Sequence, residues 1–221
     1  MKKSLFLERT KNISFFENLD DDILEKIASV SSIKEYRKGQ ILYYENDDIK
    51  DIYYILKGSI KFYKVDRFEN EIFLYKIDSP RLIYDVSKMS DSLTVCCFAN
   101  TEFDEDSTIM IIDSTIFREC FMGNDIFMKK ILHESFEAIA QFQCIINRDI
   151  VFDGTAKVAH FLATQPELFD KLKKHEIAYM LHIQPETLSR ILKKLVRNGI
   201  ISVEKNRLKV LKSNELKKIY K

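Results

Sequence analysis

Apolar residues in the first half of the chain fall in short runs separated by polar breaks. The runs are rich in Ile, Tyr, Val and Phe, and their even spacing is typical of an all-β roll or barrel. The breaks hold Gly39, Asn46, Gly58 and Asn70, whose residue types tolerate positive φ. Ahead of the strands, residues 20–30 predict a short amphipathic helix with acidic residues in its first turn. The predicted strands are residues 41–44, 52–56, 60–65, 72–77, 94–98 and 108–112.

The apolar pattern becomes helical at residue 125 and stays so to about residue 149. One line of residues recurs at alternating steps of four and three, which is the seam of a coiled coil. This line is Met128, Leu132, Ser135, Ile139, Phe142 and Ile146, and a second line is Phe127, Ile131, Ala138 and Ile145. The first line either pairs with the same helix of a second copy or packs on the chain's own β domain. We favour the dimer, in which the second line makes the contact within the chain.

Residues 174–211 predict two short helices followed by a hairpin. The first helix covers residues 176–181, and His182 and Ile183 fill the turn after it. Pro185 suits the first turn of the second helix, because its missing N–H is not needed there. The second helix then carries one apolar stripe, formed by Leu188, Ile191, Leu192 and Leu195.

The hairpin follows Asn198-Gly199, a dipeptide suited to a left-handed helix stop. Residues 200–203 and 208–211 are its predicted strands, and Lys205 and Arg207 make its tip basic. The order of helix, turn, helix and basic hairpin is that of a DNA-recognition helix with a wing.

The face of the second helix opposite the apolar stripe is polar and mainly cationic. It holds Glu186, Ser189, Arg190, Lys193, Lys194 and Arg197. A carboxylate can accept a hydrogen bond from cytosine N4, and a guanidinium can bridge guanine O6 and N7, so Glu186 and Arg190 can read adjacent base pairs. The alternative is an ordinary surface ion pair between the same two residues.

The net charge of +1 hides an asymmetry between the two parts of the chain. Residues 155–221 hold 15 Lys and Arg against 6 Asp and Glu, a net charge of +9. Residues 1–154 hold 20 against 28, a net charge of −8. A basic carboxyl-terminal part predicts a partner rich in phosphate, here double-stranded DNA, with binding that weakens steeply in salt.

Other classes of protein find little support in the sequence. No run reaches the roughly 18 apolar residues of a membrane span, and the first apolar stretch ends at Leu7, so we expect a cytoplasmic protein with no membrane partner. Cys96, Cys97, Cys120 and Cys144 lack the spacing of a disulfide framework, which favours reduced thiols. No arrangement of catalytic or metal-ligating residues stands out, so we expect neither an enzyme nor a metal site.

The order of these parts resembles the CRP/FNR family of transcriptional regulators over nearly the whole chain. The resemblance rests on Pro185-Glu186-Thr187-Leu188-Ser189-Arg190, followed by Leu195, Gly199 and Ile200, and on turn motifs that contain Gly39, Glu45 and Gly58. It implies an α+β fold: an amino-terminal β-roll of the cyclic-nucleotide-binding type, a long dimerisation helix and a carboxyl-terminal winged helix-turn-helix. The divisions would be residues 1–123, residues 124–150 and residues 151–221, with Asp153-Gly154 as the hinge.

The resemblance also implies roles for single residues. Glu186, Ser189 and Arg190 match the base-reading positions of the FNR-type branch, whose half-sites resemble TTGA in an inverted repeat. Pro185 stands where the cyclic-AMP branch has Arg, which favours FNR-like specificity, and His182 stands where the family often has Gly. The expected phosphate contacts are Thr187, Lys193, Lys194, Arg197, Lys205 and Arg207.

The signal that the first domain senses stays unknown at this stage. Neither the Gly-Glu nor the Arg-Ser pair of the cyclic-nucleotide members is present between Pro80 and Cys97, although Arg81 could contact an anion; otherwise it is a solvated loop residue. No Cys precedes Cys96, which disfavours the amino-terminal iron–sulfur cluster of other members. Cys96 and Cys97 are candidates for redox chemistry or are small core residues. Haem stays open, with His133 as the candidate ligand.

The sequence therefore predicts a transcriptional regulator, an activator or a repressor, that binds DNA as a homodimer. Its activity would be modulated through the β-roll by an unknown signal, of redox, nitric oxide or haem-linked type, and RNA polymerase is the expected further partner. The alternative is a signalling or scaffold module that binds a ligand but does not recognise a DNA sequence.

Overall fold

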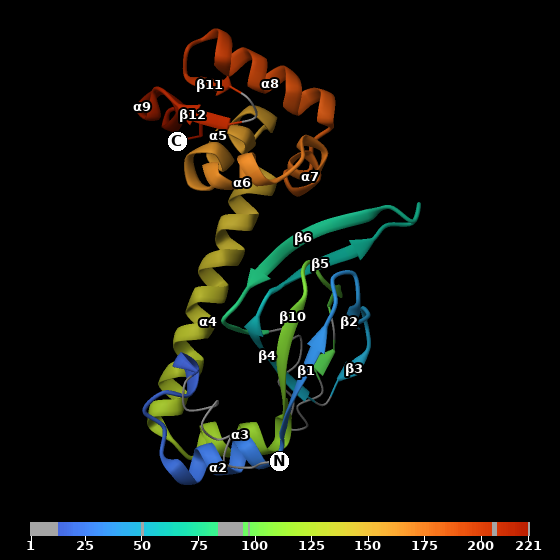
Figure 1. Cartoon of the computed structure of the whole chain (residues 1–221), viewed down its shortest axis with the longest axis vertical. Coiled ribbons are helices and arrows are strands. Elements are labelled where there is room, and N and C mark those ends of the chain that lie inside the picture. The colour runs from blue at the N-terminus through green and yellow to red at the C-terminus, as the bar shows by residue number, and fades with distance from the viewer. Residues whose placement is uncertain (1–12, 50, 84–94, 97, 205–206, 221) are drawn as a thin grey trace. The chain divides into compact units, whose positions relative to one another are not determined.

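The computed structural model describes residues 13–49, 51–83, 95–96, 98–204 and 207–220. The chain divides into two compact units, Met1–Ile139 and Ala140–Lys221, with the division inside one long helix. The units contain the elements that the sequence predicts: an amino-terminal β-sheet domain, a long helix and a helix-turn-helix with a small wing (Figure 1). The α+β fold class is thereby confirmed. None of the described helices is long and apolar enough to cross a membrane.

The first unit is built around two four-stranded antiparallel sheets with the strand orders β1-β10-β4-β7 and β2-β9-β5-β6. A short pair, β3 with β8, completes the roll. The strands are β1 (Ser31–Tyr36), β2 (Ile41–Tyr43), β3 (Asp48–Ile49), β4 (Asp51–Lys57), β5 (Ser59–Val65), β6 (Glu71–Asp78), β7 (Arg81–Ile83), β8 (Val95–Cys96), β9 (Asn100–Phe103) and β10 (Ser107–Asp113). Sequence reasoning missed β1, β3, β7 and β9.

Two turns of the roll depend on particular residues. Gly58 joins β4 to β5 at φ 95°, and a Cβ there would lie 2.8 Å from Cα of Ser107, so no other residue fits without a shift. In the turn between β5 and β6, Glu69 adopts the positive φ of 64°. Asn70, whose residue type also tolerates positive φ, does not adopt it, and its backbone N–H and its amide both donate to the Asp66 carboxylate.

Three helical segments and the start of the long helix pack together at one end of the roll. They are the 3-10 turn η1 (Ser14–Phe16), α2 (Asp21–Ser29), α3 (Ser114–Met122) and α4 (Asp125–Ile146). Phe127 of α4 is fully buried, with ring centroids 5.7 Å from Phe15 and 5.2 Å from Phe117. Ile131 packs against the same core. The second apolar line of the long helix thus begins by covering the chain's own roll.

The second unit has a core of its own. After η2 (Asn147–Val151), a π-helical turn that continues α4, come α5 (Gly154–Thr164), α6 (Pro166–Lys171), α7 (Lys174–Met180), α8 (Pro185–Arg197), β11 (Ile201–Glu204), β12 (Arg207–Val210) and α9 (Ser213–Lys217). Asp153 caps α5, since its carboxylate accepts a hydrogen bond from Ala156 N at 2.8 Å. Buried residues from α5, α6, α7, α8, β11 and α9 form one cluster.

Candidate nucleic-acid interface

Helix α8 begins and ends where its sequence predicts. Pro185 is the first helical residue, and the carbonyl of Gln184 accepts from Leu188 N at 3.0 Å. At the other end Gly199 has a φ of 64°, and Ile200 N donates to the carbonyl of Leu195 at 3.0 Å. The stripe Leu188, Ile191, Leu192 and Leu195 is buried, with 1–6% of each residue exposed. The helix therefore has one fixed rotation about its axis, and this rotation decides which side chains face outward.

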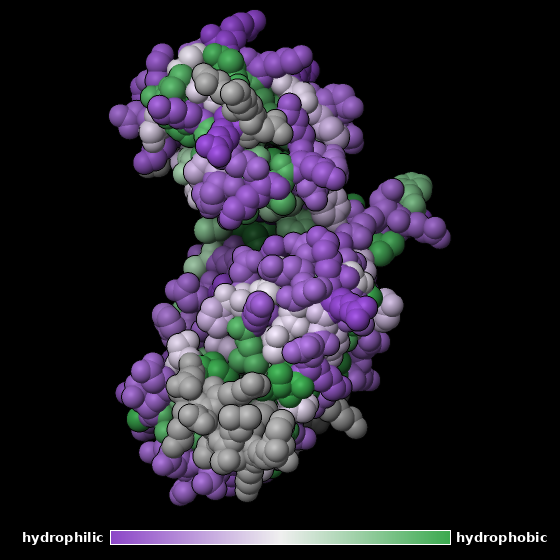
Figure 2. Space-filling model, in the orientation of Figure 1, coloured by the Kyte–Doolittle hydropathy of each residue, from purple (hydrophilic) through white to green (hydrophobic). Residues whose placement is uncertain are grey.

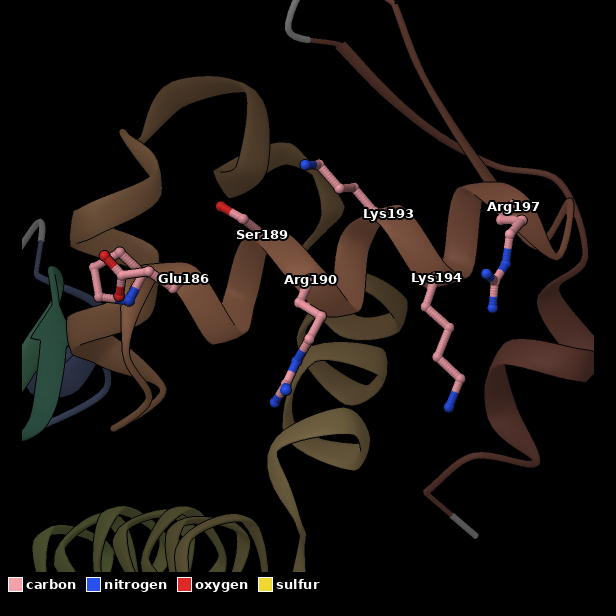
Figure 3. A pocket seen from close by; sticks show the side chains of 7 residues that line it. Glu186, Ser189, Arg190, Lys193, Lys194 and Arg197 are labelled. Atoms are coloured by element: carbon pink, nitrogen blue, oxygen red, sulfur yellow. The ribbon is translucent and has the colours of Figure 1, made fainter.

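The outward face of α8 carries the predicted contact residues. Pro185, Glu186, Ser189, Arg190, Lys193, Lys194 and Arg197 line one open groove. Figure 3 shows Arg190, Lys194 and Arg197 extending to one side of the helix and Ser189 and Lys193 to the other. All except Ser189, which is half-buried, are exposed. In the part of the chain that the structure describes, no ion pair joins Glu186 to Arg190, so both groups are available to a partner.

The outward face of α8 carries a row of cations. In the view of Figure 2, hydrophilic side chains cover much of the carboxyl-terminal unit, with hydrophobic side chains among them. Three cations of α8, Arg190, Lys194 and Arg197, follow one another at steps of four and three residues, which places them along one side of the helix. A row of exposed cations beside a polar helix face is the electrostatic pattern of a phosphate-binding surface.

The helix before α8 is fixed by its own cap. The Glu176 carboxylate accepts from Lys173 N at 2.6 Å, at the start of α7. The turn between α7 and α8 passes through His182, whose φ is 53°. The turn thus adopts the left-handed conformation with a histidine in the place of the expected glycine.

The remaining predicted phosphate contacts are Thr187 in α8 and two residues of the wing, Lys205 and Arg207. Thr187 is half-buried, and its methyl group faces the start of α5, 3.8 Å from where a Cβ on Gly154 would lie. Arg207, at the start of β12, is exposed, while Lys205 lies outside the described residues.

The contact between Asp170 and the wing was not predicted by the sequence analysis. The Asp170 carboxylate, at the end of α6, accepts from Leu208 N of the wing at 2.9 Å. The two residues are 38 positions apart, so no local pattern could have paired them.

The predicted effector residues are scattered over the first unit. Arg81 is not a solvated loop residue, since it lies in β7 with its Nε 4.0 Å from Oε2 of Glu134 on α4. Burial raises the pKa of Glu134, and the charges of Arg81 and His133 oppose that shift. His133 itself lies exposed on α4, at a groove that Lys129 and Lys130 also line. Phe15 and Ile126 line the same groove, so it combines apolar and charged side chains, and haem binding by His133 stays a prediction.

The cysteines are only partly described. Cys96 lies in β8, Cys97 is outside the described residues, and so is the stretch 84–94 in which a cyclic-nucleotide signature was sought. Cys120 is buried and Cys144 is exposed, and both are free thiols. Among the described residues, no three His, Cys, Asp or Glu side chains are placed to hold a metal ion.

Comparison with known proteins agrees with this geometry. Residues 156–219 match the family model of the Crp-like helix-turn-helix domain. No curated protein matches the chain in sequence. Among solved structures, a mutant of CooA from Carboxydothermus hydrogenoformans is similar with a TM-score of 0.71 at 20% identity, over 93% of this chain and 92% of that one.

Two further structures share the fold. FixK2 from Bradyrhizobium japonicum has a TM-score of 0.66 at 15% identity, over 86% of this chain and 97% of that one. A CRP/FNR family regulator from Eubacterium rectale has a TM-score of 0.68 at 16% identity, over 94% and 97%. The structure thus joins a β-sheet domain and a long helix to a Crp-like helix-turn-helix domain, the class of domain that binds DNA. Over most of its length the chain shares the fold of these proteins, and its helix-turn-helix is of the Crp-like family.

Proposed function

We propose that the protein acts as a homodimer that binds an inverted repeat of TTGA-like half-sites, with α8 of each copy in the major groove. The observation that carries this proposal is the outward face of α8, where an exposed carboxylate and an exposed guanidinium one turn apart lie beside a row of cations. The buried stripe of three leucines and Ile191 behind this face holds it at one rotation. A rigid helix with unpaired polar groups suits direct reading of bases.

The roles follow from chemistry and position. Glu186, Ser189 and Arg190 lie in the first half of α8, the part of a recognition helix that reaches base edges. Lys193, Lys194, Arg197 and Arg207 are exposed cations suited to phosphates, as is Lys205 by its residue type. Thr187 is also a proposed phosphate contact, through its hydroxyl. Pro185 offers no side-chain donor, which favours the FNR-like half-site.

Helix α4 is the proposed dimerisation element, and it lies within residues 124–150, the range predicted for a dimerisation helix. Leu132 is 50% exposed, Ile139 51% and Ile146 54%, and Phe142 lies on the same stripe. Met128 and Ser135, which complete the line, are half-buried. An apolar stripe at coiled-coil spacing that the described residues leave in solvent fits pairing with a second copy. Two recognition helices would then meet half-sites about one helical turn of DNA apart.

The first unit is the proposed site at which a signal acts. It joins the dimer helix through Phe127 and through the pair of Arg81 and Glu134, so a change within the roll can reach α4 directly. The nature of the signal is left open by the described residues. RNA polymerase is the proposed further partner. The proposed location of the protein is the cytoplasm.

The proposal is tested by the affinity of the purified protein for a TTGA inverted repeat and for a scrambled duplex, at two salt concentrations. We expect two chains per duplex and a preference of about 10³-fold or more for the repeat, with binding to both duplexes weakening as salt rises. Equal affinity for both duplexes would contradict sequence recognition and favour a module that binds polyanions without reading sequence.

A further inference from the structure

The wing is a two-stranded hairpin, which by itself is at best marginally stable in water. Its base is fixed to the end of α8, because Leu211 N and Lys212 N both donate to the carbonyl of Ile200, at 2.9 and 3.1 Å. Leu208 and Val210 pack against the core of the second unit. These contacts orient the strands, but the exposed Arg207 lies near the far end of the hairpin, where β11 and β12 meet at Glu204 and Arg207.

Asp170 supplies a contact at this far end. Its carboxylate accepts from Leu208 N at 2.9 Å, directly beside Arg207. The N–H of Leu208 therefore points away from β11 and toward α6. Asp170 itself is exposed, but its helix is held in place, because the neighbouring Phe169 is 6% exposed and belongs to the core, and α6 packs along β12.

The charge of Asp170 makes its position informative. A carboxylate close to a proposed phosphate-binding surface repels DNA, so on electrostatics alone its removal should strengthen binding. A net contribution of Asp170 to DNA binding would therefore come from the geometry that it imposes. Asn keeps the accepting oxygen and removes the charge, whereas Ala removes both.

We propose that Asp170 is a positioning residue for DNA binding, which holds the wing so that Arg207 reaches a phosphate of the DNA backbone. This inference rests on the proposed function, since it assumes that the wing contacts DNA. It assigns a role to α6, a helix whose residues we place in no contact with bases. The bond between Asp170 and Leu208 acts on backbone contacts, so it affects all duplexes alike.

The test compares Asp170→Ala, Asp170→Asn and Arg207→Ala on the TTGA repeat and on the scrambled duplex over a range of salt. For Asp170→Ala we expect affinity about three- to tenfold weaker on both duplexes and a salt slope smaller by about 1, which is the loss of one phosphate contact. Asp170→Asn should bind within about twofold of the wild type or more tightly. Arg207→Ala should reduce the salt slope by the same amount. In the double variant, Asp170→Ala should cause no further loss beyond that of Arg207→Ala.

Equal behaviour of the alanine and asparagine variants, whether weaker or tighter, would overturn the inference while wild-type binding still supports the proposed function. A wild type that binds neither duplex would overturn the proposed function itself. If Asp170→Ala does not fold, amide hydrogen exchange of the wild type and of Asp170→Asn tests the inference instead. The Leu208 N–H should be protected in the wild type and in Asp170→Asn, and rapid exchange in both would remove the basis for the inference.

Discussion

Nζ of Lys157 lies 3.6 Å from Oδ1 of Asp149, and this pair joins the first turn of α5 to the π-helical turn η2. Lys157 is 8% exposed, and the guanidinium of Arg148 donates to both oxygens of the same carboxylate, at 3.0 and 2.8 Å. Burial acts to raise the pKa of Asp149, but the Arg148 hydrogen bonds and the charges of Arg148, His182 and Lys157 outweigh it and hold the pKa below its usual range.

Asp149→Ala should destabilise the second unit, because it leaves the Lys157 ammonium buried without this carboxylate. We expect a loss of about 1–3 kcal/mol in the free energy of unfolding, less than for a fully buried pair because Asp149 is partly exposed. Urea denaturation measures the loss. Asp149→Ala combined with Lys157→Met should recover most of it, since both charges are then gone. Losses that simply add would show that the two side chains are not coupled.

His160 should make stability depend on pH. Its ring lies 5.1 Å from Tyr220 and 5.5 Å from Phe152, and burial, then the charge of Arg148, lowers its pKa. The unfolded chain therefore takes up the proton more readily, so stability is full above a pH of about 6.5 and falls as the pH drops toward the folded pKa. His160→Phe should reduce this fall between pH 7.5 and 5.5, as measured by denaturant midpoints. An unchanged pH dependence in the variant would contradict the assignment of this loss of stability to His160.

His182→Gly should stabilise the turn between α7 and α8. A φ of 53° is unfavourable for His and natural for Gly. After the greater flexibility of Gly in the unfolded chain is subtracted, we expect a gain of about 0.5–1 kcal/mol in the free energy of unfolding. His175→Gly, in the helical backbone of α7, is the matched control and should lower stability. If His182→Gly is also destabilising, then the contacts of the His182 side chain outweigh the backbone cost.

Placing a charge on the exposed stripe of α4 tests the proposed dimer. Ile139→Asp should convert the dimer into a monomer, because it sets two carboxylates against each other in an apolar seam. Sedimentation velocity checks the mass, and affinity for the inverted repeat should fall to that for a single half-site. Glu137→Gln, also exposed on α4 but off the stripe, should change neither. A wild type that is monomeric at micromolar concentration would contradict the proposed interface.

The strands that sequence reasoning found and missed differ in a physical way. β4, β5, β6 and β10 are rich in apolar residues and were predicted to within about two residues. β1 was missed because it is an edge strand with mostly exposed or half-buried side chains. β9 was missed because its buried Asn100 and Thr101 are polar, and Asn100 is accommodated by a hydrogen bond from Glu45 N that joins residues far apart in the chain.

The candidate interface was readable from sequence because its signals are local. Pro185, the apolar stripe and Gly199 fix where α8 begins, which face it buries and where it ends. The start of α3 carried a comparable local signal that the sequence analysis overlooked, because the Asp113 carboxylate accepts from Thr115 N and Ile116 N as an N-cap does. The pairing of Arg81 with Glu134 and the contact of Asp170 with Leu208 depend on tertiary structure, and no spacing along the chain announces them.

The central claim is that Glu186 and Arg190 read bases, and the most direct test pairs each residue with a change in the DNA. We would measure the affinity of the wild type, Glu186→Ala and Arg190→Ala for the TTGA inverted repeat and for versions with single base-pair substitutions. The account predicts that each variant loses about 1–3 kcal/mol on the intact repeat and becomes insensitive to one base pair of the half-site. Variants that lose equal affinity for every duplex, or none, would contradict direct readout by this helix.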